Sequence, residues 1–258
     1  MGAEPDSYAR SPVLGVECFA GDLETVAQAV VSRALSKQGG YACLCNVHVL
    51  VTARHSGELR QALDAAWMNV PDGAPVAWWQ RRAGVESAGR IGGPDLMPRV
   101  VERGQAVGLR HFLFGSTPQV LQLLRRRLEE TYRDVQIVGA LAPPFGLWTD
   151  AERASTVATI RSASPDVIWC ALGAPKQELW MARHASALSP AVVLGVGAAF
   201  DFVARTKPRA PVWMQRAGLE WLHRLEREPR RLAWRYLRTN AEFVALAAFT
   251  FSAPERRR

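Results

Sequence analysis

The fold is decided by the stretch Val167-Ile-Trp-Cys-Ala-Leu172, followed by Gly173-Ala-Pro-Lys176-Gln-Glu-Leu-Trp180. The short apolar run predicts a buried strand, and the segment after the Gly-Ala-Pro turn predicts a helix over residues 176–188. A second apolar run at residues 191–196 predicts another strand. A strand, a helix and a further strand form the unit from which parallel sheets are built.

The same alternation extends outward in both directions. Further strands are predicted over residues 13–19, 41–47, 111–114 and 135–138, and helices over residues 23–35, 118–128 and 152–161. Asp22 is placed to cap the first of these helices. We therefore predict an α/β, Rossmann-like layered fold with a largely parallel sheet. In such sheets the ligand crevice lies outside the carboxyl ends of the strands.

Charge divides the chain into two parts. The 258 residues are 48% hydrophobic, enough for one sizeable core, and their net charge is +8. Residues 203–258 contain 13 basic and five acidic residues, whereas residues 1–202 contain 19 of each. We predict a neutral α/β catalytic domain over residues 1–202 and a basic helical appendage over residues 203–258. An excess of positive charge indicates an anionic partner: nucleic acid, a nucleotide diphosphate or a membrane surface.

The basic residues of the tail are patterned. One helix face carries Arg224, Arg227, Arg231, Arg235 and Arg238 beside a stripe of Leu225, Leu232, Tyr236, Phe243 and Ala247. Pro229 is expected to divide the segment into two helices, with the proline in the first turn of the second. Three interpretations remain open: a solvated face, an arginine surface for substrate phosphates, or, with Trp221 and Trp234, a surface for anionic lipids.

Other patterns exclude several classes of protein. The four cysteines form no CxxC pair, so we expect buried thiols in a reducing cytoplasm. No secretory signal or membrane-spanning stretch is predicted. No two aspartates are separated by one residue, and the five histidines show no metal-binding spacing. A divalent ion, by which many sugar-nucleotide enzymes hold a diphosphate, is therefore not expected, and arginines and helix N-termini would replace it.

Two turns carry residues suited to chemistry. The turn at Gly115 runs from a predicted strand into a helix N-terminus, where backbone N–H groups favour a phosphate. Asp72 lies in Pro71-Asp72-Gly73, where its carboxylate could act as a general base. Each is also compatible with an ordinary turn.

A stronger signal appears when eight segments are taken together. In chain order they are Asn46-Val-His48, Pro71-Asp72-Gly73, Gly89-Arg90-Ile-Gly-Gly-Pro-Asp95-Leu, Phe112-Leu-Phe-Gly115, Leu172-Gly-Ala-Pro-Lys176-Gln177-Glu178-Leu-Trp180, Gly195-Val-Gly-Ala-Ala-Phe-Asp201-Phe, Arg209-Ala-Pro211 and Gly218-Leu-Glu220-Trp221-Leu-His-Arg224-Leu-Glu-Arg-Glu228-Pro229. This series resembles the WecG/TagA/CpsF family of bacterial glycosyltransferases, glycosyltransferase family 26, over most of the chain.

The resemblance implies an activity. Members transfer a sugar from a UDP-sugar to a polyprenyl-diphosphate-linked saccharide in exopolysaccharide, capsule or wall-polymer synthesis, with inversion and without a metal or other cofactor. The family's presumed catalytic base falls on Asp72, and its diphosphate-binding arginine falls on Arg90. Members of the family use N-acetylmannosamine, its uronic acid, glucose and other hexoses. The sequence does not indicate which of these sugars this chain transfers.

The resemblance also implies further contacts. Asn46, Gln177 and Asp201 fall on positions expected to contact sugar, acceptor or nucleotide, Asp201 being assigned to uridine. Many members carry threonine where this chain has Leu44, so the contact of that threonine is expected to be absent or to be replaced by Cys45 or His48. In the appendage, Arg224, Arg231 and Arg235 are expected to face the substrate diphosphate or the membrane.

The expected location follows from the same resemblance: cytoplasmic, peripheral on the inner face of the plasma membrane. The expected partners are the UDP-sugar, the lipid-linked acceptor and an anionic membrane, not nucleic acid, and a homo-oligomer is left open. Two other hypotheses have less support in the sequence. A nucleotide-binding oxidoreductase is disfavoured because GxGxxG is missing. A nucleic-acid-binding α/β protein using the basic tail is the alternative function.

Overall fold

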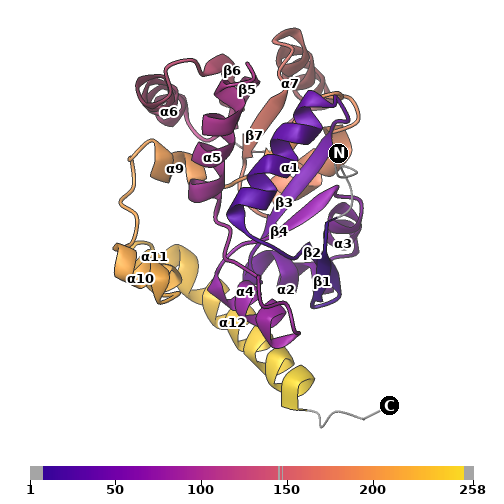
Figure 1. The fold of residues 1–258 in the computed structure, drawn as a ribbon, viewed down its shortest axis with the longest axis vertical. Coiled ribbons are helices and arrows are strands. Elements are labelled where there is room, and N and C mark those ends of the chain that lie inside the picture. The colour runs from indigo at the N-terminus through magenta and orange to yellow at the C-terminus, as the bar shows by residue number, and fades with distance from the viewer. Residues whose placement is uncertain (1–7, 145, 147, 253–258) are drawn as a thin grey trace.

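The computed structural model describes residues 8–144, 146 and 148–252. Within these residues, a six-stranded parallel sheet forms the centre (Figure 1). The strand order is β4 (Met68–Pro71), β3 (Gly40–Cys45), β8 (Val192–Gly195), β7 (Val167–Ala171), β5 (Arg110–Gly115) and β6 (Gln136–Leu141). The predicted α/β fold with a largely parallel sheet is confirmed.

Alternating side chains of the strands enter two separate hydrophobic cores. In β3, Tyr41, Cys43 and Cys45 belong to one core, and Ala42 and Leu44 belong to the other. This period of two is the geometry of a strand that is buried on both faces. The first face is covered by α2 (Val47–His55), α3 (Gly57–Asp64), α7 (Asp150–Ser162) and α8 (Lys176–His184), and the second by α1 (Leu23–Leu35), α5 (Gly93–Gln105), α6 (Pro118–Thr131) and α9 (Ala199–Val203).

The helix predictions hold closely, because their start signals are strong. The α1 helix covers the predicted residues, and its N-cap Asp22 accepts a hydrogen bond from the Thr25 N–H at 2.8 Å. The other predicted helices are present with shifted ends. All four cysteines are free and buried, as predicted.

One predicted strand is wrong. Residues 13–19 form the end of a hairpin of β1 (Arg10–Val13) and β2 (Val16–Phe19), not a single strand of the sheet. The turn needs two residues in the left-handed region, and Leu14 and Gly15 have φ angles of 50° and 80°. The β4 strand was not predicted from the sequence. Its four residues are all buried, so they show no alternation of polar and apolar side chains.

The C-terminal segment forms α10 (Val212–Arg216), α11 (Glu220–Arg227) and α12 (Pro229–Ser252), with α12 beginning at the expected proline. Phe243 and Ala247 of α12 are buried in the core that α2 covers. Trp79 of α4 (Ala74–Arg82) lies 5.5 Å from the Phe243 ring, centre to centre. In Figure 1, α10 and α11 lie at the lower left, below α9, while α12 runs beneath α2 and α4. The tail is therefore packed against the α/β layers along α12.

The sheet has its topological switch point between β3 and β8. These neighbouring strands are the first and last of the sheet in sequence, with β4 on one side and the remaining three strands on the other. A crevice is expected outside the carboxyl ends of strands at such a point.

Candidate active site

A cleft of about 260 Å³ lies at this switch point. The ends of β3, β4, β7 and β8 contribute Asn46, Asp72, Gly173 and Val196 to its walls. The C-terminal segment closes the opposite wall with Arg209, Glu220, Trp221, Arg224, Tyr236 and Asn240. The cleft is therefore built jointly by the sheet and the tail.

Asp72 is held at the turn that joins β4 to α4. Its backbone N–H donates to the Cys45 carbonyl at 3.0 Å, which extends the pairing of β4 with β3 by one residue. The next residue, Gly73, has a φ of 93° and is the N-cap of α4. A side chain would be strained at this φ, so glycine allows the sharp turn that directs the carboxylate into the cleft.

Asn46 holds the Asp72 carboxylate from the neighbouring strand. Its side-chain oxygen caps α2 by accepting from the Val49 N–H at 3.2 Å. Its side chain is also hydrogen-bonded to Asp72. Since the oxygen is used by the cap, the amide NH₂ is the group that faces the carboxylate. The cap thus fixes the orientation of the donor.

The surroundings of Asp72 contain groups that raise and groups that lower the pKa of its carboxyl. The pKa of its carboxyl is raised from the ordinary 3.8 to about 6, mainly by burial and also by the nearby negative charge of Glu220. Arg224, Asn46 and Arg90 act in the opposite direction because they stabilise the carboxylate. A carboxyl with this pKa is ionised at neutral pH and still basic enough to take a proton.

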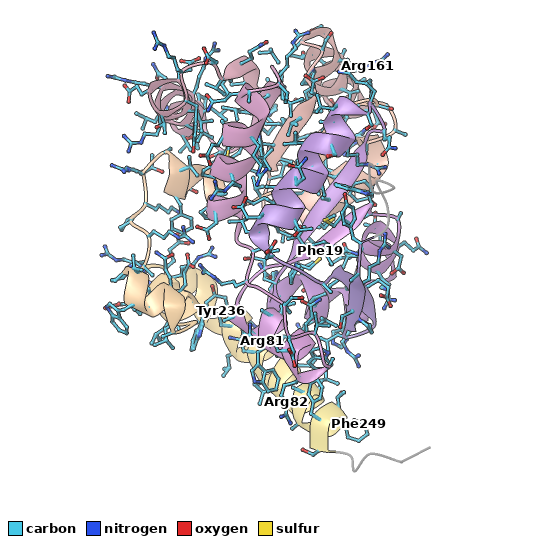
Figure 2. All side chains as sticks on the ribbon, viewed as in Figure 1. Phe19, Arg81, Arg82, Arg161, Tyr236 and Phe249 are labelled. Carbon is cyan, nitrogen blue, oxygen red and sulfur yellow. The ribbon has the colours of Figure 1, made fainter. Side chains whose placement is uncertain are left out.

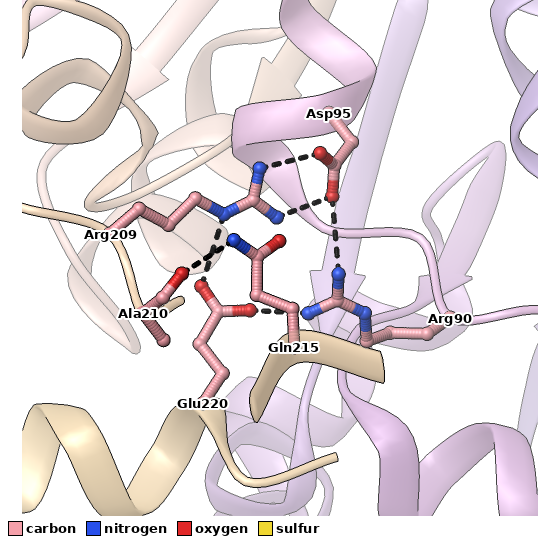
Figure 3. Close-up of polar contacts among 6 residues, drawn as sticks. All are labelled: Arg90, Asp95, Arg209, Ala210, Gln215 and Glu220. Atoms are coloured by element: carbon pink, nitrogen blue, oxygen red, sulfur yellow. Dashed lines mark hydrogen bonds and ion pairs between the residues drawn. The ribbon is translucent and has the colours of Figure 1, made fainter. Parts of the chain in front are cut away.

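Arg90 belongs to a closed ring of two arginines and two carboxylates (Figure 3). Its guanidinium donates to Glu220 and lies 3.5 Å from the Asp95 carboxylate. Arg209 donates to both Asp95 oxygens at 2.6 Å and lies 3.4 Å from Glu220. Gln215, which donates to the Ala210 carbonyl at 2.7 Å, braces the loop beside Arg209. In this structure Arg90 is therefore paired with carboxylates of the protein.

Arg224 of α11 is the other cation of the cleft that acts on Asp72. Its guanidinium lies 5.8 Å from the centre of the Phe202 ring, a cation–π distance. Among the ion pairs formed by the described residues, none involves Arg224. Its positive charge is the largest favourable influence on the Asp72 carboxylate. An arginine of helix α11 thus places positive charge near the Asp72 carboxylate at the end of β4.

The chain matches a known protein family over most of its length. The sequence model of the glycosyl transferase WecG/TagA/CpsF family matches residues 11–257. The chain belongs to this family. It is therefore a glycosyltransferase of cell-wall or polysaccharide synthesis, and the match spans both the sheet and the tail.

Several other positions marked by the family resemblance line the same cleft. Gln177 is buried, and its amide oxygen accepts from the Gly173 N–H at 3.2 Å. His48 lines the cleft, with its ring nitrogen 3.4 Å from the Thr52 hydroxyl. Leu44, where many members have threonine, also faces the cleft. A Cβ on Gly93 would lie 3.3 Å from the Leu44 side chain, so this leucine packs against the start of α5.

A buried carboxyl supports Gln177 from behind. Glu178 has no exposed surface, and its Oε1 accepts from the Gln177 amide at 2.9 Å. Its Oε2 has no hydrogen-bond partner among the described residues. Burial raises the pKa of Glu178 to about 7. The sequence analysis assigned no role to this residue.

Two predicted site residues lie outside the cleft. Gly115 has a φ of 113°, and a Cβ there would lie 2.6 Å from the Ala171 carbonyl group, so glycine is needed for the close approach of β5 and β7. Asp201 accepts from the Thr206 hydroxyl at 3.2 Å, while the adjacent Phe202 lines the cleft. The side chains of Arg231 and Arg235 lie outside the part of the chain that the structure describes.

Sequence reasoning missed the partners of Arg90. Asp95, Arg209 and Glu220 all fall inside the motifs that carry the family resemblance, so their segments were marked without a role for these residues. Nothing in the spacing indicates that positions 90 and 220 meet, because the contact depends on how the tail folds back.

The described side chains of the site do not form a cluster that could bind a metal ion. Among the described residues, no group of three or more His, Cys, Asp or Glu side chains could hold an ion. Within the same residues, no helix is both long and apolar enough to cross a bilayer.

Proposed function

We propose that the protein is an inverting glycosyltransferase that moves a hexose or N-acetylhexosamine from a UDP-sugar to a polyprenyl-diphosphate-linked saccharide. The observation that carries this proposal is the environment of Asp72. A carboxylate with a pKa of about 6 lies in a cleft whose walls also carry Arg90 and Arg224. A base and two cations in one cleft suit the attack of a hydroxyl on a sugar that bears an anionic leaving group.

The proposed step needs one carboxylate. Asp72 takes the proton of the acceptor hydroxyl while that oxygen forms a bond to the anomeric carbon. The bond from this carbon to the diphosphate oxygen breaks on the opposite face, and UDP leaves with the electron pair. Such a single displacement inverts the anomeric configuration. Arg90 and Arg224 would stabilise the negative charge that develops on UDP as it leaves. The step as proposed therefore uses no metal ion.

The surface of the tail supports a lipid-linked acceptor. Exposed apolar side chains occur along α10 and α12, where Trp213 is 64% exposed, Trp234 74% and Phe249 83%. Figure 2 shows Phe249 near the C-terminal end of α12. Arg227 at the end of α11 and Arg230 and Arg238 of α12 are also exposed. Aromatic and basic side chains together favour the interface of an anionic membrane.

The donor and acceptor can be identified by UDP release. A set of UDP-sugars is incubated with the protein and a polyprenyl-diphosphate-linked saccharide in detergent, and UDP is measured with and without the acceptor. Acceptor-dependent release with one UDP-sugar supports the proposal. If no UDP-sugar gives acceptor-dependent release, while another nucleotide sugar does, the donor assignment is wrong.

Binding to membranes can be tested with vesicles. The protein should sediment with vesicles of anionic lipid more than with neutral ones, and Trp234→Ser combined with Phe249→Ser should reduce this binding. Leu123→Ser, an exposed leucine of α6, is the matched control. Preference for duplex DNA over anionic vesicles at physiological salt would favour the nucleic-acid-binding alternative instead.

A further inference from the structure

The four contacts of the ring around Arg90 are unequal. The Arg209 fork is satisfied by both oxygens of Asp95, each at 2.6 Å. Arg90 instead reaches Asp95 at 3.5 Å and makes its closest contact with Glu220. Bidentate pairs of arginine with carboxylate are among the stronger polar contacts of proteins. The Asp95–Arg209 pair is therefore the fixed part of the ring, and the contact from Arg90 to Glu220 is the one that can be exchanged.

The exchangeable contact crosses the cleft. Arg90 comes from the loop before α5, and Glu220 is the first residue of α11. Both line the cleft, and their side chains are 24% and 19% exposed. A ligand that enters the cleft can thus reach both groups from solvent.

We propose that the Glu220 carboxylate occupies the place of the donor diphosphate on Arg90, and that the diphosphate displaces it on binding. This inference rests on the proposed function, because it takes the leaving group to be a nucleoside diphosphate. Glu220 is then an internal competitor of the substrate, carried by the tail.

The exchange leaves no charge in the site without a partner. When phosphate oxygens take over Arg90, Glu220 still lies 3.4 Å from the Arg209 guanidinium. Asp95 keeps its two bonds to Arg209. Arg90 is never left unpaired, which matters because an unpaired charge in a partly buried site is costly. Guanidinium groups bind carboxylate and phosphate oxygens with the same fork geometry, so one can replace the other.

A double-mutant cycle with two probes tests the exchange. Inorganic pyrophosphate and UDP are titrated by calorimetry into the full-length wild-type protein, Glu220→Gln, Arg90→Gln and the double variant. Glu220→Gln keeps the size of the side chain and removes its charge. We expect it to tighten pyrophosphate and UDP binding about tenfold in the wild-type background, and to have little effect when Arg90 is already replaced.

Two controls separate exchange from general effects. Glu228→Gln removes another carboxylate of the tail, which pairs with Lys207 at 2.7 Å, and it should leave both affinities unchanged. Uridine, which has no phosphate, should bind Glu220→Gln and wild type equally. Thermal unfolding of each variant verifies that it is folded.

The outcomes distinguish this inference from the proposed function. Equal or weaker pyrophosphate binding by Glu220→Gln, or the same tightening in the Arg90→Gln background, overturns the exchange, even if UDP-sugar transfer is found. Tightening of pyrophosphate that depends on Arg90, in a protein that binds no UDP, supports the exchange and shows that the donor was assigned wrongly.

Discussion

The side chain of Asn46 is hydrogen-bonded to the carboxylate of Asp72 and at the same time caps α2. The two residues follow neighbouring strands of the sheet, β3 and β4. The hydrogen bond lowers the pKa of Asp72. Asn46 therefore has two roles: it caps α2, and it lowers the pKa of the proposed base.

The two roles of Asn46 can be separated by mutation. Asn46→Ser should keep the cap, because serine caps helices well, while removing the donor to Asp72. We expect the acid limb of the rate profile to move to higher pH in Asn46→Ser, with little loss of stability. Asn46→Ala should show the same shift and also lose about 1 kcal/mol of unfolding free energy. Profiles identical to wild type in both variants would show that this hydrogen bond does not act on the base.

Replacing the proposed base should affect transfer and not donor binding. Asp72→Asn keeps the shape of the side chain but cannot take a proton. Loss of a general base costs about 10²- to 10⁴-fold in rate, so kcat should fall by this factor while the affinity for UDP stays within a few-fold. The measurements are acceptor-dependent UDP release and calorimetry with UDP. Transfer near the wild-type rate would assign the base to another residue.

The pH dependence of the reaction should report Asp72. The carboxyl must be ionised to act as a base, so kcat/KM should fall as the pH decreases through about 6. A bound diphosphate offsets the positive charges of Arg90 and Arg224, which lower this pKa in the free protein. The acid limb of kcat should therefore lie at higher pH than that of kcat/KM. Initial rates from pH 5 to 8 test this, and a flat kcat/KM profile would contradict it.

Arg224 should act on both the donor and the base. Arg224→Gln removes the charge that most favours the Asp72 carboxylate, so the acid limb should move to higher pH. A lost charge-assisted contact to the diphosphate should also weaken UDP binding about tenfold. Arg227→Gln, an exposed arginine of the same helix, is the matched control and should change neither quantity. Equal effects of the two variants would mean that only the overall charge of the tail matters.

The buried Glu178 should make stability depend on pH. Its pKa is about 7 in the folded protein against an ordinary 4.5, so the folded state binds more protons between these values. Stability from this residue is therefore greatest below pH 4.5 and is lost as the pH rises through 7, by up to about 3 kcal/mol. The advantage of Glu178→Gln over wild type in urea unfolding should grow from pH 5 to pH 8. Glu129→Gln, on an exposed part of α6, is the control for the loss of a charge.

The parts of the fold that were predictable are those with local signals. Asp22 marks the start of α1, and Pro229 marks the start of α12. The break in the predicted strand at residues 13–19 was not visible, because Leu14 adopts a positive φ that leucine rarely takes. The β4 strand was missed because four buried residues are too few to show a period.

Residues of the candidate site could be predicted only where they occupy a position of a family motif with an expected role. Asn46, Asp72, Arg90, Gln177 and Arg224 lie together, although they come from five different segments. The Arg90–Glu220 contact was not predictable, because it joins positions that are 130 residues apart and no local pattern encodes it. Gly115 belongs to one of the motifs, but its role in the structure is to allow the close approach of β5 and β7, and it does not line the cleft.

The ring of Arg90, Asp95, Arg209 and Glu220 has no net charge, so its field cancels within a short distance. An anion approaching through solvent is attracted mainly by the exposed arginines of the tail and by Arg224, which forms no ion pair with the described residues. Added salt screens that attraction over about 8–10 Å. The charges inside the ring are in contact and are screened much less. Ionic strength should therefore change how fast a diphosphate arrives at the cleft far more than how long it stays.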